Sequence, residues 1–332
     1  MKSVKNDKVK VFTTIRRVED DANYASRLQD MINKNEALKF DGILFFQNNS
    51  NDIEPWVLGQ EIFGQSLSQS PIIAVNPVYI HPYTVAQKIA TLSKFYKRKT
   101  YLNFITGTSN SDREAIGDQL SHAERYDRLD EYIEIIYKLL SSKSPVNFQG
   151  TYYTINNLKL TSVLDESLFP VGYLAGSSPE AQKIRKKRNL ANLRMGKPLA
   201  KCTQGMFQST GMYFGIIARE TRLEAISVMK NKFQPEYEEY DELLELSMLN
   251  TDAVWKKLLK EETEDDVFRM EPFQHFNADC PYLVGSFEDV ATYIGQYIDL
   301  GVDSFVIDAD LEELDRIAAV FRLFQPAISI VS

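Results

Sequence analysis

The hydrophobic positions of the chain alternate between short apolar runs and longer stretches in which apolar residues recur at helical spacing. Residues 40–46 and 71–79 are near-continuous apolar runs, as expected for strands that are buried on both faces of a parallel sheet. Residues 24–35 and 84–95 carry apolar residues at helical spacing, which predicts amphipathic helices. The same reasoning predicts strands at residues 8–14 and 101–105 and helices at residues 56–63 and 123–140. Four strand–helix units of roughly 30 to 35 residues result, the length that a parallel crossover needs.

The second half of the chain continues this alternation with more interruptions. Residues 147–160 are rich in β-formers and predict a strand pair, and the acidic segment 235–263 predicts helical structure within an insertion at about residues 233–282. The remaining strands are predicted at residues 170–175, 190–195, 211–218 and 304–307, and helices after Pro179 and Thr221 and at residues 286–300 and 311–324. Eight parallel strands with helices between them, in one domain of residues 1–332, predict an α/β protein of the (β/α)8 TIM-barrel type. A doubly wound dinucleotide-binding fold is disfavoured, because no GxGxxG follows the first strand.

Composition and charge exclude several classes of protein. Hydrophobic residues make up 44% of the chain and charged residues 25%, which is ordinary for a globular protein and argues against disorder. The net charge of −8 disfavours a nucleic-acid partner, and the basic run at residues 183–188 is interpreted as a solvated helix face. Two cysteines cannot form a disulfide framework, and no apolar leader or long apolar segment is found. We therefore expect a cytoplasmic protein without a membrane partner.

The stretch of residues 101–126 places polar residues directly after a predicted strand. The strand breaks at Thr106, a polar loop follows, and a charged helix completes the stretch. Parallel α/β proteins bind their ligands where strands end and hand over to loops. The candidate ligand contacts are therefore Asn103, Thr106, His122, Arg125 and Tyr126, and for Arg125 a structural ion pair is favoured.

These candidates also have structural interpretations. A Thr-Gly-Thr sequence at Thr106 can end a strand for local reasons alone. Ser121 and Glu124 are three residues apart, so they can form a capping box that fixes the helix start without any ligand. His122 and Tyr126 are four residues apart and share one helix face, so both interpretations can hold together.

The sequence Gly176-Ser177-Ser178 lies between a predicted strand and a predicted helix. Free backbone N–H groups and two hydroxyls at a helix N-terminus can hold an anion without any lysine. The alternative is an ordinary serine N-cap.

Further candidates follow other predicted strands. His81 comes after the third strand and is the candidate acid or base, since imidazole titrates near neutrality; the alternative is that it anchors a loop beside Pro82. Phe12, Phe46 and Asn48 end the first two strands and are expected to line a substrate pocket, although core packing also explains the phenylalanines. The three histidines have no carboxylate or cysteine beside them at ligand spacing, so no metal site is expected.

Four short motifs, in order along the chain, match the motifs of one known family. Residues 101–108, YLNFITGT, and the His-x-x-Arg-Tyr of residues 122–126 match its fourth strand and the helix that follows. Residues 146–153, VNFQGTYY, match its v-x-F-x-G-x-Y-Y hairpin, and residues 282–286 and 300–305 match its C-terminal V-G and G-V-D-x-F pair. Through these motifs the chain resembles the bacterial-luciferase-like flavin-dependent monooxygenases, and within them the alkanesulfonate-monooxygenase branch.

This resemblance implies a (β/α)8 barrel that uses reduced FMN supplied by a separate NAD(P)H:flavin reductase. O2 reacts at the flavin, and a small organic substrate is oxygenated. The resemblance also implies that Gly176, Ser177 and Ser178 hold the FMN phosphate, and that Asn103, Thr106, His122 and Tyr126 contact the flavin. Relatives form homodimers or homotetramers, so a homo-oligomer is expected.

One departure from the family pattern bears on the substrate. Where the sulfonate branch carries Arg-x-His in its seventh strand, this chain has Tyr213-Phe214-Gly215, and Tyr213 is taken as a residue of the substrate pocket. A sulfonate needs cationic or multi-donor recognition. Oxygenation of a small compound in natural-product biosynthesis is therefore the leading prediction. The alternatives are alkanesulfonate desulfonation, an F420-dependent oxidoreductase and a non-catalytic flavin-binding subunit.

Overall fold

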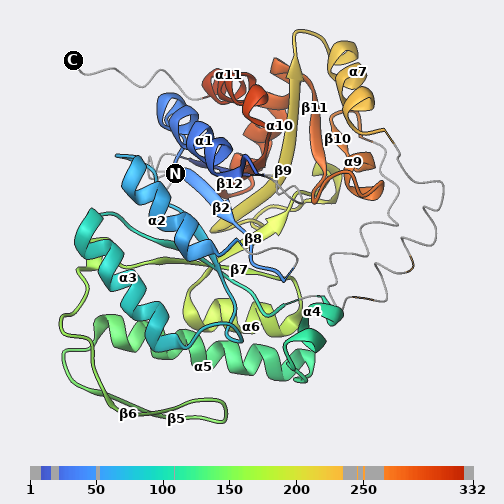
Figure 1. Ribbon diagram of the computed structural model, residues 1–332. Coiled ribbons are helices and arrows are strands. Elements are labelled where there is room, and N and C mark those ends of the chain that lie inside the picture. Colours follow the sequence, from blue (N-terminus) through green and yellow to red (C-terminus); the bar gives the residue numbers. More distant parts are fainter. Residues whose placement is uncertain are drawn as a thin grey trace, which may run out of the picture. The chain divides into compact units, whose positions relative to one another are not determined.

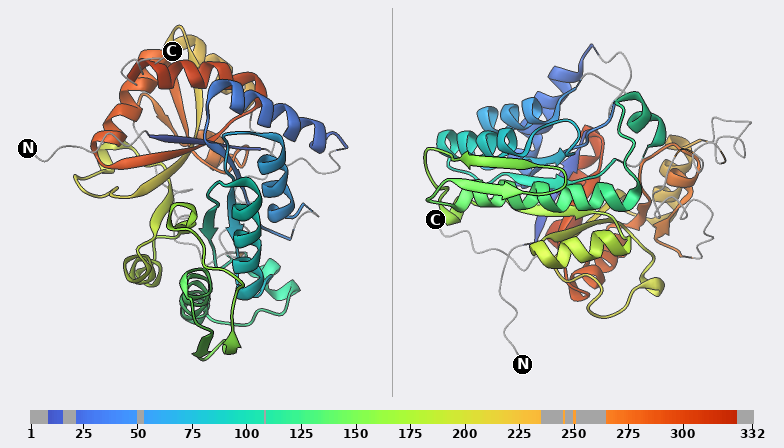
Figure 2. Two further views of the ribbon diagram at one scale, coloured as in Figure 1. Left: turned by 90° about the vertical axis from the view of Figure 1, so that its left-hand side faces the viewer. Right: turned by 90° about the horizontal axis from the view of Figure 1, so that it is seen from below.

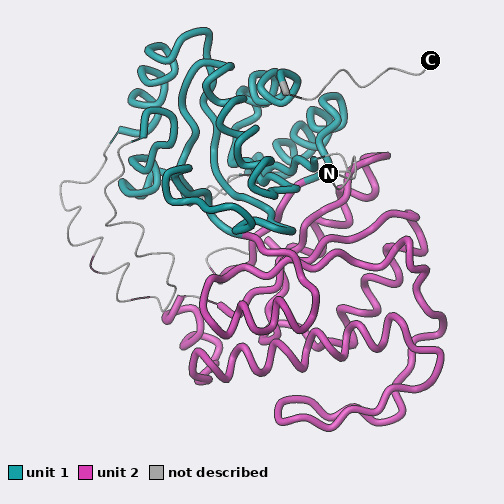
Figure 3. The backbone as a smooth tube through the Cα atoms, turned by 180° about the vertical axis from the view of Figure 1, so that it is seen from behind, with its two compact units in different colours: residues 1–42, 194–240, 259–332 teal, residues 43–193, 241–258 magenta. Residues whose placement is uncertain are grey.

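The computed structural model describes residues 9–15, 22–49, 53–107, 109–234, 245, 250 and 265–324. The chain divides into two compact units, which are coloured separately in Figure 3. Unit 1 comprises residues 1–42, 194–240 and 259–332, and unit 2 comprises residues 43–193 and 241–258.

Unit 2 is built on parallel strands with helices between them (Figure 1). Its strands follow the order β2 (Gly42–Phe45), β3 (Ile72–Val75), β4 (Tyr101–Phe104), β7 (Val171–Ala175) and β8 (Ala191–Met195). Its helices are α2 (Pro55–Gln65), α3 (Pro82–Tyr96), α4 (Asn110–Ala115), α5 (His122–Ser141) and α6 (Pro179–Arg188). Helix α5 packs between α3 and α6.

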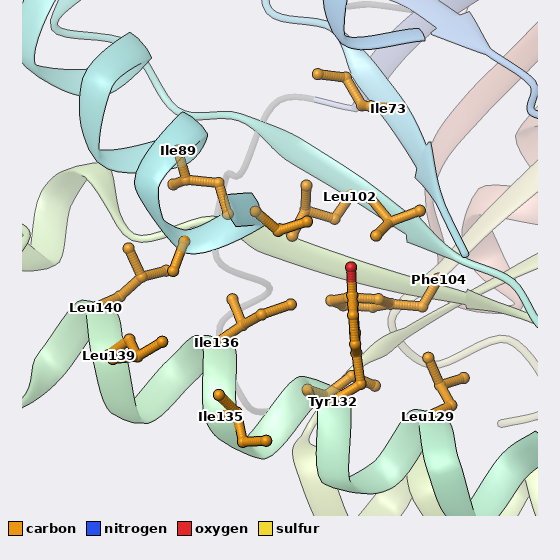
Figure 4. Close-up of a cluster of buried hydrophobic side chains, with 14 of the residues drawn as sticks. Ile73, Ile89, Leu102, Phe104, Leu129, Tyr132, Ile135, Ile136, Leu139 and Leu140 are labelled. Atoms are coloured by element: carbon orange, nitrogen blue, oxygen red, sulfur yellow. The ribbon is translucent and has the colours of Figure 1, made fainter. Parts of the chain in front are cut away.

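The packing of the unit 2 core determines on which face of β4 its polar side chain lies. Leu102 and Phe104 are fully buried among apolar side chains of α5, including Leu129 and Ile136 (Figure 4). Successive side chains of a strand point to opposite faces. Asn103, between them, therefore points away from the helix layer. It lies one residue before the carboxyl end of β4, the end at which α/β barrels bind their ligands, and we call this side of the strand its ligand-side face.

An antiparallel hairpin of β5 (Val146–Gln149) and β6 (Thr154–Leu158) lies along α5, as both views in Figure 2 show. The carboxylate of Glu131 on α5 accepts three backbone N–H groups from the hairpin tip: Thr151 at 2.7 Å, Tyr152 at 2.9 Å and Tyr153 at 3.1 Å. This one side chain therefore anchors the hairpin to the helix.

Unit 1 has the strand order β10 (Phe268–Arg269), β11 (Tyr282–Ser286), β9 (Thr210–Arg219), β12 (Val302–Asp308) and β1 (Lys10–Thr14), and all pairs except β10–β11 are parallel. Its helices are α1 (Tyr24–Leu38), α7 (Arg222–Lys232), α9 (Glu271–Gln274), α10 (Phe287–Asp299) and α11 (Leu314–Phe324).

Three contacts identify the helix-covered face of this sheet. Asn35 of α1 donates to Thr13 Oγ1 of β1 at 2.8 Å. The ring of Phe305 (β12) lies 5.8 Å from that of Phe321 (α11), and the ring of Phe214 (β9) lies 6.0 Å from that of Tyr297 (α10). Alternation then turns Thr14, Asp308 and Gly215 to the opposite face.

Within the described ranges, eight parallel strands alternate with helices as β1, β2, β3, β4, β7, β8, β9 and β12, and the predicted (β/α)8 TIM-barrel fold is confirmed. Two elements were not anticipated: α4 falls in the stretch expected to be a polar loop, and β11 adds a parallel strand to β9. Most of the predicted helical insertion, residues 235–263, lies outside the described residues, and the single-domain organisation stays a prediction. No helix in the described ranges is long and apolar enough to span a membrane.

The core of unit 2 predicts a clear difference between two leucine substitutions. Leu102→Ala removes a side chain with no exposed surface, whereas Leu223→Ala acts on a side chain that is 81% exposed. We expect Leu102→Ala to lower the free energy of unfolding by about 2–5 kcal/mol and Leu223→Ala by at most about 0.5 kcal/mol, as measured by urea denaturation. Equal effects of the two substitutions would contradict the assignment of the core.

Candidate active site

Asn103 presents an unused hydrogen-bond acceptor on the ligand-side face of β4. Its side chain is 3% exposed, and the residue pairs in register with Ala74 of β3 and Tyr173 of β7. Asn103 Oδ1 has no hydrogen-bond partner within the described residues. An unsatisfied buried carbonyl costs about 1–3 kcal/mol, so this position is suited to a ligand that brings a donor.

The turn after β4 keeps the second predicted contact close to this face. Thr106 is buried, and Gly107 follows it with a φ of +76°, which favours glycine. Asn76, directly after β3, lies against the same turn, because a Cβ on Gly107 would be 3.3 Å from Asn76 Nδ2. Sequence reasoning missed Asn76, although an asparagine that ends the apolar run IIAVN is the same kind of signal that identified Asn103.

The start of α5 combines its structural cap with two candidate ligand contacts. Ser121 and Glu124 form the predicted capping box, which confirms that interpretation of the helix start. The His122 and Tyr126 rings lie 5.0 Å apart, and His122 Nδ1 is 3.7 Å from a Glu180 carboxylate oxygen at the start of α6. The pKa of Glu180 is lowered by hydrogen bonds to its own backbone N–H and to Ser178, with a smaller contribution from His122.

The N-terminus of α6 approaches Tyr126 very closely. Gly176 has a φ of +139°, and a Cβ there would lie 2.6 Å from Tyr126 Oη. The hydroxyl of Ser178 accepts the N–H of Ala181 at 3.2 Å, so it is a helix N-cap, while Ser177 is exposed. The structure thus brings the separately predicted Gly176–Ser178 turn and the His122–Tyr126 helix face into one site. Their cofactor-binding roles stay predictions.

The other candidates of unit 2 have more local surroundings. His81 is the N-cap of α3: its Nδ1 accepts the N–H of Tyr83 at 3.2 Å, and its ring meets that of Tyr153 edge-on at 5.9 Å. This geometry matches the loop-anchoring alternative, and an acid–base role stays a prediction. Phe46 and Asn48 follow β2 and are partly buried.

Unit 1 contains a buried polar group that sequence reasoning missed. Thr14 Oγ1 donates to Asp308 Oδ1 at 2.9 Å, and Tyr282 Oη donates to Asp308 Oδ2 at 2.5 Å. Thr14 and Asp308 end β1 and β12 on the face turned away from the helices. The predicted pocket residues Phe12 and Tyr213 are both buried. Phe12 comes two residues before Thr14 on β1, and Tyr213 comes two residues before Gly215 on β9, so both side chains lie on this same face.

A cavity of about 590 Å³ lies elsewhere in unit 2. It is lined by Pro77, Val78, Gly117, Asp118, Gln119, Leu120, Glu124, Arg128, Tyr152 and Tyr153. Arg128 makes a two-pronged ion pair with Asp118, at 3.0 and 2.8 Å. None of the predicted site residues lines this cavity. No cluster of three or more potential metal ligands occurs in the described part of the chain.

Comparison with known proteins assigns the class of this protein. The family described as luciferase-like monooxygenase matches residues 8–202, and the chain belongs to this family. The enzyme is accordingly a flavin-dependent monooxygenase.

Individual relatives resemble the chain over most of its length. It is 31% identical over 290 residues to the 4-(gamma-L-glutamylamino)butanoyl-[BtrI acyl-carrier protein] monooxygenase BtrO of Niallia circulans. The aligned region covers 83% of this chain and 84% of that protein. Among solved structures it resembles the long-chain alkane monooxygenase LadA (TM-score 0.73, 18% identity, 96% of this chain and 91% of that one). It also resembles the riboflavin lyase RcaE, solved with modified FMN and riboflavin (TM-score 0.72, 14% identity, 96% and 91%).

The close approach of Gly176 to Tyr126 gives a testable prediction. Gly176→Ala adds a clash to an unfavourable φ, whereas Gly117→Ala has a φ of +72° and open space around its Cβ. We expect Gly176→Ala to lower the melting temperature more than Gly117→Ala, with a cost of about 1–3 kcal/mol for a strained position. Adding Tyr126→Phe, which removes the clashing hydroxyl, should recover part of the loss. No recovery in the double variant would contradict this contact.

Proposed function

We propose that this protein is the oxygenase of a two-component system, which uses reduced FMN from a separate NAD(P)H:flavin reductase and O2 to oxygenate a small organic substrate. Membership of the luciferase-like family supports flavin-dependent oxygenation. The observation that carries the proposal further is the buried, unpartnered Asn103 Oδ1 on the ligand-side face of β4.

The residues present fit a flavin mononucleotide. Asn103 Oδ1 would accept an N–H from the flavin ring, and Thr106, three residues further along the chain, is a buried residue whose hydroxyl can donate or accept. The backbone N–H groups at the start of α6, next to Gly176, would hold the phosphate, and His122 would supply an imidazole near this helix start. Bound reduced FMN supplies the reaction with O2, while the protein orients the reactants and excludes water.

The proposed substrate belongs to natural-product biosynthesis. The BtrO relative acts, by its name, on a 4-(gamma-L-glutamylamino)butanoyl group carried on an acyl-carrier protein. A sulfonate is disfavoured, because Tyr213 and Gly215 of β9 stand where the sulfonate branch has arginine and histidine. A cytoplasmic location and a homo-oligomeric state remain parts of this proposal.

The test is an anaerobic titration of the protein with reduced FMN, followed by quenching of the protein's intrinsic fluorescence. Asn103→Ala should weaken binding roughly 5- to 30-fold, as expected for one hydrogen bond to a buried group, and Tyr126→Phe should also weaken it. Asn192→Ala is a matched control: Asn192 Oδ1 is likewise buried and unpartnered, but it pairs in register with Leu174, which belongs to the helix-side core. This control should retain wild-type affinity.

Two outcomes would contradict the proposal. If Asn103→Ala binds reduced FMN with unchanged affinity, Asn103 does not contact the flavin and β4 is not part of the flavin site. Binding of F420 with hydride transfer in the absence of O2 would assign the deazaflavin chemistry named for one structural relative, an F420-dependent secondary alcohol dehydrogenase with 16% identity and a TM-score of 0.64.

A further inference from the structure

Four neighbouring strands of unit 1 place one row of residues side by side. Gly215 of β9 pairs in register with Tyr282 of β11 on one side and with Asp308 of β12 on the other. On β1, Thr14 follows Thr13, which pairs with Ile307 of β12, so Thr14 lies beside Asp308. The row therefore ends at the carboxyl ends of β1 and β12, where barrels of this type build their active sites.

Gly215 is what allows Tyr282 to reach Asp308. A Cβ on Gly215 would lie 2.2 Å from the Tyr282 ring, so the ring crosses the strand directly over this glycine. The phenol then donates to Asp308 Oδ2, and Thr14 donates to Oδ1. The space over Gly215 is thus filled by a tyrosine from the next strand, and the hydroxyl of this tyrosine reaches the carboxylate of Asp308.

Asp308 is a buried carboxylate with no cationic partner among the described residues. It is 7% exposed, and its hydrogen bonds come from two neutral hydroxyls. Two other carboxylates of unit 1 have cationic partners: Glu313 pairs with Arg219 and Asp289 with Arg222. Burying an unpaired charge is costly, so such groups are normally paired.

The surroundings of Tyr213 support the same local charge. Burial raises the pKa of Tyr213 well above its ordinary value, and Cys280, Asp308, Asp279 and Tyr282 raise it further. Two of these neighbours, Asp308 and Asp279, are carboxylates, so negative charge lies close to Tyr213.

We infer that Asp308, held in place by Thr14 and Tyr282, binds a protonated amino group of the substrate. A charge-assisted N–H···O bond to a carboxylate is roughly twice as strong as a neutral one, and an ammonium supplies the missing counter-charge. The inference rests on the proposed function and names its substrate class: the enzyme acts on amino-bearing compounds and rejects anionic groups at this position.

The experiment compares two series of small probes by calorimetry, with FMN absent. The charged series consists of ω-aminoacyl N-acetylcysteamine thioesters of two to six acyl carbons, and the neutral series replaces the ammonium by a methyl group. Wild-type protein should prefer at least one charged probe to its neutral counterpart. Asp308→Asn should weaken that charged probe roughly 10- to 100-fold and leave the neutral probe unchanged.

Two further variants complete the test. Asp303→Asn makes the same change at the opposite end of β12, where Ser304 donates to the carboxylate, and it should bind like wild type. Tyr282→Phe keeps the charge and should retain part of the preference, which keeps the test decisive if Asp308→Asn does not fold. No preference for any charged probe in the wild type, or an unchanged preference in Asp308→Asn, would overturn the inference. Anaerobic binding of reduced FMN, measured on the same proteins, tests the proposed function separately.

Discussion

The two-residue alternation of side chains along buried parallel strands is the constraint on which the rest of this structure depends. In β4 it sends Leu102 and Phe104 into the helix layer and leaves Asn103 on the opposite face. In unit 1 it sends Thr13 to α1 and turns Thr14 toward Asp308. A shift of one residue in either strand would bury the polar group against the helices and expose the apolar ones, so the same apolar packing that stabilises the fold also positions its chemistry.

Two glycines also determine where the polar groups lie, because each permits a close approach that a Cβ would block. At Gly176 the missing Cβ makes room for the Tyr126 hydroxyl, which joins the starts of α5 and α6. At Gly215 it makes room for the Tyr282 ring, which joins β11 to β12 across β9. In both places a tyrosine from another element occupies the space that a Cβ would fill. The glycine permits the close approach, and the tyrosine hydroxyl provides a hydrogen-bonding group.

Much of this could be predicted from the sequence, because strand–helix alternation and motif order are local signals. Apolar runs and helical spacing located the strands and helices of unit 2 closely, and Asn103 was identified by its place within a strand. The link between Gly176 and Tyr126 could not be derived from spacing, since it depends on how two helices pack. Asp308 was missed for the same reason: its partners Thr14 and Tyr282 lie 294 and 26 residues away, and β11 gave too short a pattern to stand out as a strand. His81 was singled out by its chemistry, whereas the structure shows it as a helix N-cap.

We propose that reduced FMN binds at the strand ends and helix starts of unit 2, and backbone hydrogen exchange tests this proposal most directly. Exchange followed by mass spectrometry, under anaerobic conditions with and without reduced FMN, separates this site from the cavity beside Arg128. This proposal predicts slower exchange in peptides covering residues 101–107 and 176–182, which contain no residue that lines the cavity, and no change in peptides covering residues 149–154. Protection confined to the residues around the cavity, or no protection anywhere, would contradict it.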